Sequence, residues 1–170
     1  ISETNLGKRI ALSMVVKFGR TRVQTLAVLL AVNFILAFFV PSTTARASLI
    51  LPISIVLLEV YQELPGQSKF GKLMMLQNVQ NNAFATSMVM TATSAQVIAI
   101  GFINKQAGAN LGYMDWLIAS LPQALFTAII VFLIGIKLFK IDKEGGQEAL
   151  ANVKATLAKQ LDELGPLSSA

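Results

Sequence analysis

Two short polar segments interrupt long apolar stretches of this chain, and both carry groups that could bind a small charged solute. The first is residues 41–46 (Pro-Ser-Thr-Thr-Ala-Arg), between apolar runs at 23–40 and 47–61, and the second is residues 91–96 (Thr-Ala-Thr-Ser-Ala-Gln). Their hydroxyls and freed backbone groups could coordinate a cation through oxygen or hydrogen-bond a carboxylate. A helix that starts after the first break would favour an anion there, because its dipole and unpaired N–H groups face the tip.

Arg46 is the only charged residue between Arg22 and Glu59. An ionisable side chain at membrane depth is costly, so it is by default a functional candidate. The alternative is that Arg46 snorkels to lipid headgroups, if the first apolar run spans the membrane. The hydroxyls of both breaks have a structural alternative as well, which is hydrogen bonding to the preceding turn or to a neighbouring helix.

The composition indicates an integral membrane protein. The 170 residues are 54% hydrophobic and only 14% charged, whereas a soluble domain is about 25% charged. The net charge of +5 comes from Lys and Arg that flank apolar segments, so we expect lipid and not nucleic acid as the partner of these residues. The chain contains no Cys and no His, which removes the thiol nucleophile and the commonest general base and metal ligand. We therefore expect neither an enzyme nor a metal site.

The hydropathy pattern predicts an all-α integral membrane protein. The predicted segments are an amphipathic interfacial arm helix at 1–22, a hairpin at 23–61 with its tip at 41–46, a cytoplasmic loop at 62–72, a broken transmembrane helix at 73–103 that unwinds near 91–96, an external loop at 104–115, a transmembrane helix at 116–139, and a cytoplasmic amphipathic helix with a connector at 140–170. The second arm of the hairpin is shorter than the roughly 20 apolar residues of a spanning helix, so we predict that the hairpin enters the membrane and turns back. Unwound backbone at that depth requires surrounding protein or a water-filled cavity. The chain starts at Ile1 without an initiator Met, which we interpret as a cut inside a longer polypeptide.

The distribution of basic residues predicts the orientation. Lys and Arg number five in 1–22, two in 62–72, one in 104–115 and five from 137 to the end. The predicted topology places all of these except Lys105 on one side, which the positive-inside rule makes cytoplasmic. Two full membrane spans in place of the hairpin would leave every loop on the same side, so this count does not distinguish the two topologies.

Other polar and sulfur-containing residues of the apolar segments have structural interpretations. We predict that the amides at 77–82 make hydrogen bonds between helices instead of contacting a solute, and that the methionines at 74, 75, 88 and 90 pack in the core. Tyr113 and Trp116 lie where an aromatic belt at the membrane interface is expected.

The two breaks resemble those of the divalent anion:sodium symporter family, in particular the bacterial and plastid di- and tricarboxylate carriers. That family has a Pro-Ser-Asn-Thr-Ala-Arg-Ala tip followed by an apolar Pro-Ile, and here 41–47 read Pro-Ser-Thr-Thr-Ala-Arg-Ala, followed by Leu-Pro-Ile at 51–53. Residues 6–12 (Leu-Gly-Lys-Arg-Ile-Ala-Leu) resemble the amphipathic arm helix of the family. Gln-Asn at 80–81 and Thr-Ala at 91–92 are similar to residues of its broken helix.

The resemblance implies an inverted-repeat carrier, usually a homodimer, that moves carboxylates by an elevator motion. This chain would supply the first repeat's part of the transport domain, with the rest of the polypeptide as its partner. Carried over by position, the substrate ligands would be Ser42, Thr43, Thr44, Arg46 and Thr93, and the cation ligands, if sodium is the coupling ion, would be Ser42, Thr43, Thr91 and Ala92. No cofactor is expected. The expected location is the inner cell membrane as a multi-pass protein, or the plastid inner envelope in a plant.

One departure from the family's tip favours exchange of anions. The family's Asn is Thr43 here, so an amide that could bind cation and carboxylate together is lost. Arg46 offers an alternative, in which a fixed guanidinium pairs with the dianion in place of sodium. An empty site would then carry a buried positive charge that is costly to move across the membrane, so the carrier would move only when loaded.

Three alternatives remain beside exchange. Sodium-coupled symport would use the same hydroxyls, whereas in a non-transporting membrane subunit the breaks would serve helix packing alone. A channel would need a hydrophilic face along a spanning helix, and 116–139 offers only Ser120, Gln123 and Thr127.

Overall fold

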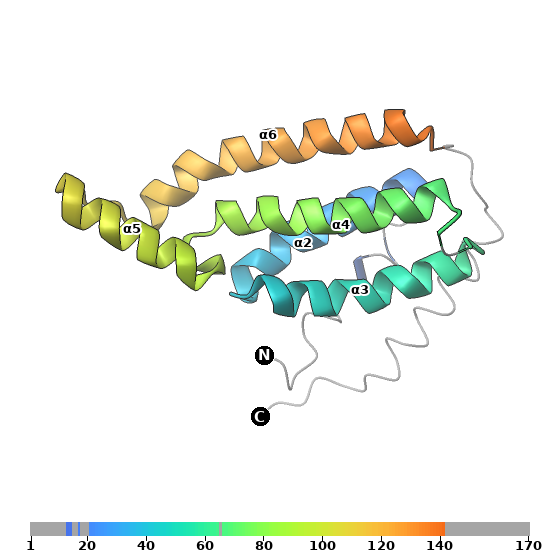
Figure 1. Ribbon diagram of the computed structural model, residues 1–170, viewed down its shortest axis with the longest axis horizontal. Coiled ribbons are helices and arrows are strands. Elements are labelled where there is room, and N and C mark those ends of the chain that lie inside the picture. Colours follow the sequence, from blue (N-terminus) through green and yellow to red (C-terminus); the bar gives the residue numbers. More distant parts are fainter. Residues whose placement is uncertain (1–12, 15–16, 18–20, 65, 142–170) are drawn as a thin grey trace, which may run out of the picture.

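The computed structural model is all-helical over the residues it describes, which are 13–14, 17, 21–64 and 66–141 (Figure 1). In chain order these residues form α2 (Arg22–Phe39), α3 (Thr43–Val60), α4 (Lys69–Met88), the short 3-10 helix η1 (Met90–Ala92), α5 (Ser94–Ala107) and α6 (Tyr113–Phe139). The arm helix predicted at 1–22 and the amphipathic helix predicted at 140–170 lie almost entirely outside the described residues.

α2 and α3 form an antiparallel hairpin with a short tip at residues 40–42 (Figure 1). α2 ends because Val40 precedes a proline, which disfavours helical backbone, and Val40 is extended at φ −118° and ψ 96°. The hydroxyl of Ser42 accepts a hydrogen bond from the backbone N–H of Ala45 at 3.3 Å and caps α3. The tip predicted at 41–46 was therefore too long, because everything after Ser42 already belongs to the first turn of α3.

The helix predicted at 73–103 is interrupted at residues 89–93, between α4 and α5. Thr93 is extended, at φ −152° and ψ 144°, and α5 starts with the next residue. The interruption thus starts two residues before the predicted 91–96 and covers its first half, whereas its last three residues are helical. α5 ends at Gly108, which has the left-handed φ of 61° that ends many helices.

Because of their capping residues, two helices start earlier in the chain than predicted. α4 begins within the predicted loop 62–72, because the Ser68 hydroxyl accepts a hydrogen bond from the backbone N–H three residues later at 2.8 Å. α6 begins at Tyr113, before the predicted 116–139. The carboxylate of Asp115 accepts a hydrogen bond of 2.9 Å from the backbone N–H of Gly112 and so caps the start of the helix. The predicted loop at 104–115 is correspondingly shorter.

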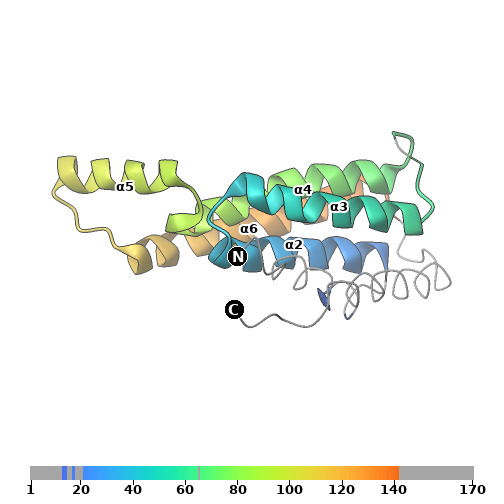
Figure 2. The ribbon, with the colours of Figure 1, turned by 90° about the horizontal axis from the view of Figure 1, so that it is seen from below.

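α4 is the central helix and packs against α2, α3 and α6 (Figures 1 and 2). One core cluster, around Leu73 and Met74, lies towards the open end of the hairpin, and another contains Phe34 and Met88 near the breaks. Gly135 allows α6 to approach α4 closely, since a Cβ there would lie 2.7 Å from the Cδ1 of Leu73. The packing role predicted for the methionines is confirmed for these two buried side chains.

The open end of the hairpin is closed by polar and aromatic contacts. Arg22 forms an ion pair of 2.6 Å with Glu63 and lies over the ring of Phe70, 5.7 Å from its centroid. The Tyr61 ring meets Phe70 edge to face, and its hydroxyl hydrogen-bonds the hydroxyl of Thr25 at 2.9 Å. These contacts fix the distance between the two arms at the end opposite the tip.

Among the described residues, α2 and α6 are long and apolar enough to cross a membrane. The 27 residues of α6 extend for about 40 Å at the α-helical rise, which exceeds the hydrocarbon thickness of about 30 Å. Its outward face exposes large apolar side chains, among them Ile118 and Phe126. A continuous exposed face of this kind is stable against lipid or further protein, not against water.

Candidate functional site

The hairpin tip and the α4–α5 break lie side by side at one end of the bundle (Figures 1 and 2). The end of α2 also packs against η1, which lies inside the break. α3 and α5 both begin in this region, so the positive ends of two helix dipoles meet there. The start of α3 is capped by Ser42, whereas Thr93 makes no capping hydrogen bond at the start of α5.

The sequence-predicted residues lie at these two breaks or in the first turn after them, and they differ in exposure. Ser42, Thr43 and Thr93 are half-buried, Thr44 and Thr91 are exposed, and Ala92 is buried. Within the described residues, no protein group hydrogen-bonds to the hydroxyls of Thr43, Thr44, Thr91 and Thr93. The hydroxyl of Ser42 is occupied as an acceptor by the cap of α3. Four hydroxyls are therefore available to a solute, two from each break.

Arg46 lies inside the protein, with 0% of its surface exposed. Its Nε donates to Oδ1 of Asn82 at 3.0 Å and its Nη1 donates to the carbonyl of Val40 at 2.9 Å. Its Nη2 donates to the hydroxyl of Thr86. All three partners are neutral, and within the described ranges no carboxylate pairs with the guanidinium. The tip therefore contains a buried positive charge that these partners solvate but do not cancel.

Asn82 and Thr86 complete a set of contacts that we call the tip latch, formed by these two residues with Arg46. The Nδ2 of Asn82 donates to the carbonyl of Thr43 at 2.9 Å, and the hydroxyl of Thr86 donates to the carbonyl of Asn82 at 2.6 Å. The backbone is thus held on both sides of the tip, at Val40 and at Thr43, by side chains that reach to or from α4. The latch fixes the tip to α4.

Two of the other amides of α4 confirm the prediction of hydrogen bonds between helices. Asn78 Nδ2 donates to the hydroxyl of Ser54 on α3 at 2.6 Å, and Gln77 Nε2 donates to the carbonyl of Phe132 on α6 at 3.4 Å. The sequence showed that these amides lie close together along the chain. It did not predict which of them would hydrogen-bond Arg46.

Sequence reasoning missed Asn33, in the middle of α2. Its side chain is fully buried, and its Nδ2 donates to the carbonyl of Leu29 at 3.0 Å. Its Oδ1 has no hydrogen-bond partner among the described residues. Asn33 lines a hollow of about 420 Å³ between α3 and α4. Thr44 and the latch residue Asn82 line the same hollow. A single Asn in an apolar run was the only signal available in the sequence.

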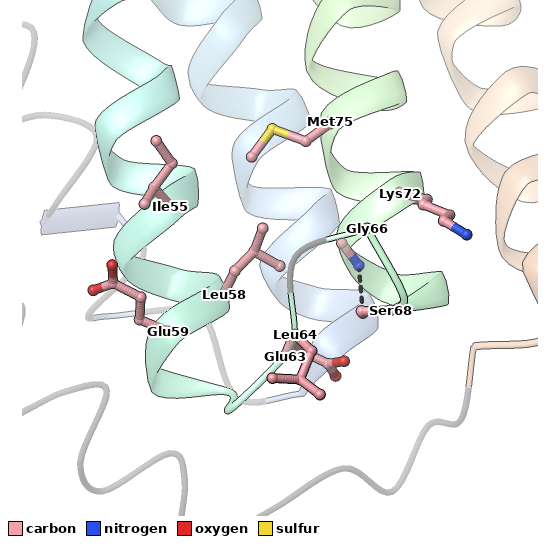
Figure 3. Close-up of a pocket in the computed structure, with 10 residues that line it drawn as sticks. Ile55, Leu58, Glu59, Glu63, Leu64, Gly66, Ser68, Lys72 and Met75 are labelled. Atoms are coloured by element: carbon pink, nitrogen blue, oxygen red, sulfur yellow. Dashed lines mark hydrogen bonds between the residues drawn. The ribbon is translucent and has the colours of Figure 1, made fainter.

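A second hollow, of about 410 Å³, lies at the other end of the hairpin, beside the connection from α3 to α4 (Figure 3). Ile55, Leu58 and Met75 form its apolar walls, and Glu59 and Lys72 lie on opposite sides of it. Because it is formed by the end of the bundle away from both breaks, it is not part of the site described above.

Two helices, α2 and α6, are long and apolar enough to cross a membrane, and two helix breaks lie side by side next to them, a combination typical of the transmembrane region of a transport protein. The whole chain, residues 1–170, matches the family model described as the sodium:sulfate symporter transmembrane region. The chain belongs to this family. The family consists of transporters and not of enzymes, so the resemblance stated from the tip motif and the expectation of a non-enzyme are both confirmed.

The relatives of this chain are membrane proteins about three times as long. A candidate malate transporter of Bacillus subtilis is 31% identical over 96% of this chain and 34% of its own length. An L-tartrate/succinate antiporter of Escherichia coli K12 is 30% identical over 98% of this chain and 34% of its own length. A protein of Cupriavidus necator named only as a membrane protein is 25% identical over 98% of this chain and 31% of its own length. The chain spans about a third of the length of these relatives.

Proposed function

We propose that this chain forms part of a secondary active transporter of di- or tricarboxylates of the C4-dicarboxylate and citrate class. The observation that carries the proposal is the meeting of two helix breaks, each with a helix N-terminus and two available hydroxyls. A carboxylate that leaves water needs donors in place of its hydration shell, and helix N-termini supply them in fixed positions. Thr43 and Thr44 are the proposed carboxylate contacts from the tip, and Thr93 is the proposed contact from the break.

Arg46 favours a dianion through its charge. A buried guanidinium with neutral partners leaves a positive potential at the tip, which a carboxylate in the adjacent region would offset. Without the anion, moving this charge through the membrane is costly, so we propose obligate exchange as the mode of transport. The antiporter relatives in Escherichia coli support the same choice.

Sodium-coupled symport is the alternative. The proposed cation ligands would then be Ser42, Thr43, Thr91 and Ala92, the last through its backbone carbonyl. Three of these are hydroxyl side chains, which are hard oxygen ligands suited to a small cation. The nearby guanidinium argues against a bound cation, because like charges in a low dielectric repel.

The family and the tip latch support a proposed architecture. We propose a re-entrant hairpin (α2 and α3) and a broken transmembrane helix (α4 and α5) that move together, since Arg46 and Asn82 tie the tip to α4. The remaining two thirds of the polypeptide would supply the inverted repeat and the scaffold. Two copies would form a homodimer in the inner cell membrane, or in the plastid inner envelope of a plant. The basic loops would face the cytoplasm.

The test uses the complete polypeptide that carries these 170 residues, reconstituted in proteoliposomes. Entry of labelled succinate is measured with and without internal dicarboxylate, each with and without a sodium gradient. We expect uptake that requires internal dicarboxylate and is independent of sodium. Sodium-driven uptake into empty vesicles would favour the symport alternative, while uptake that does not saturate would favour a channel. No uptake of any di- or tricarboxylate would favour the non-transporting subunit and contradict the proposal.

A further inference from the structure

The end of α4 is held by side chains from two other helices. Because the helix stops at Met88, its last carbonyls have no backbone N–H one turn ahead. The carbonyl of Ser87 accepts hydrogen bonds from Nε2 of Gln96 at 3.0 Å and from Nε1 of Trp116 at 3.1 Å. The hydroxyl of Ser120 lies 3.0 Å from the carbonyl of Met88 and 2.6 Å from the carbonyl of Trp116, so the two carbonyls share its single proton. One carbonyl therefore joins the end of α4, the start of α5 and the start of α6.

This junction controls where the unwound segment can lie. Residues 89–93 connect the Ser87 carbonyl to α5, and Gln96 returns from the first turn of α5 to that same carbonyl. The two ends of the segment are thus tied together, and Trp116 anchors both to α6. Since a carbonyl has two acceptor sites, Ser87 has none left for a cation. Any ion at this break would use the backbone of 89–93 instead.

We propose that Trp116 and Gln96 are positioning residues that hold the segment 89–93 in register with the hairpin tip and thereby set the affinity of the solute site. This inference rests on the proposed carboxylate site at the two breaks. In this proposal Trp116 acts indirectly, because its indole N–H donates to the Ser87 carbonyl. Its role is therefore different from that of an aromatic belt at the membrane interface, which needs no specific acceptor.

The first variant replaces Trp116 by benzothienylalanine, which keeps the shape of the side chain and removes only the N–H. Gln96→Leu is the second variant, and it leaves the indole in place. Tyr61→Phe is the matched control, since it also deletes one hydrogen bond but at the opposite end of the hairpin. In the complete polypeptide in proteoliposomes, the loss of one such hydrogen bond is expected to raise the KM for succinate about five-fold with little change in maximal rate. The control is expected to leave KM at the wild-type value.

A second measurement does not depend on transport. Spin labels on Ala45→Cys and Ala95→Cys, which are exposed in the first turns of α3 and α5, report by double electron–electron resonance the distance between the two helix starts that follow the tip and the segment. The 170 residues contain no Cys, so the labels attach within them only where placed. We expect a broader distance distribution in both variants and not in the control.

An unchanged distribution would overturn the inference, as would a broader distribution with an unchanged KM, or a loss of maximal rate alone. If the wild-type polypeptide moved no carboxylate, the proposed function would fail by itself, and the distance distributions would still decide whether the junction positions the segment.

Discussion

Two substitutions separate the charge of Arg46 from its hydrogen bonds. Asn82→Asp keeps an oxygen acceptor for Nε and places a carboxylate next to the guanidinium, so the hydrogen bonds of Arg46 remain while the net positive charge is cancelled. Arg46→Lys does the opposite, because it keeps the charge but loses the planar fork that reaches three partners at once.

The charge is expected to dominate solute affinity. For a dianion assumed to bind roughly 8 Å from the guanidinium, an effective dielectric constant of about 20 gives an attraction of about 4 kcal/mol. Screening by salt reduces this value, so we expect Asn82→Asp to raise the KM for succinate on the order of 10- to 100-fold. The same variant loses the donor to the Thr43 carbonyl but gains an ion pair, so its thermal stability is expected to stay close to that of the wild type.

The latch is expected to dominate stability. Lys at position 46 cannot serve both the Val40 carbonyl and Asn82, and a buried acceptor that loses its donor costs about 1–3 kcal/mol. Arg46→Lys should therefore lower the melting temperature, while its KM for succinate should rise only a few-fold because the charge is retained.

The assays are saturable uptake of labelled succinate in proteoliposomes and thermal unfolding in detergent, both with the complete polypeptide. Asn78→Asp is the matched control, since it adds the same charge one turn earlier on α4, where the partner is Ser54 and not the guanidinium. A folded Asn82→Asp variant with wild-type KM would refute the electrostatic argument. Undiminished exchange by an Arg46→Ala variant would contradict both roles of the arginine.

Three further predictions concern packing and the hairpin. Gly135→Ala places a methyl group 2.7 Å from a buried leucine on α4 and should cost about 1 kcal/mol of stability. Gly101→Ala, which has open space around it, should be neutral or stabilising. Thermal unfolding of the two variants tests this difference. Ser54→Ala should lower the free energy of unfolding by about 1 kcal/mol, because it removes the acceptor of Asn78. In a double-mutant cycle, the added change Asn78→Leu should restore most of that loss. No coupling between the two changes would contradict the hydrogen bond between these side chains. Tyr61→Phe should lower the unfolding temperature slightly without altering succinate KM, because its hydroxyl lies at the end of the hairpin away from the breaks; a changed KM would show that the hairpin base reaches the site.

Local patterns in the sequence predicted the elements well and their ends less well. Proline at 41 and the hydroxyls after it located the hairpin tip, but capping by Ser42 decided where α3 starts, and a capping residue is recognisable only when the first turn it caps is known. Likewise the Thr/Ser run at 91–96 indicated a break, although its second half is helical. The family was recognisable from the tip motif, because that motif is a local feature of the sequence.

Pairings between distant residues could not be predicted in this way. Arg46 was a candidate for the solute site because it is an ionisable residue within an apolar stretch, but its partners on α4, which lie 36 and 40 residues later, could not be predicted. Trp116 was expected at the interface, and its acceptor lies 29 residues earlier. Periodicity assigns such residues to a helix face, whereas packing selects which neighbour they meet.

The tip latch has a consequence for how the protein is made. During synthesis, the hairpin emerges from the ribosome before α4 does, so Arg46 reaches the membrane before Asn82 and Thr86 can contact it. Until the chain has grown by another 36 to 40 residues, the guanidinium can keep its hydration only in water or among the lipid headgroups. The hairpin is therefore expected to wait at the membrane surface and to enter the bilayer together with α4, as one three-helix unit.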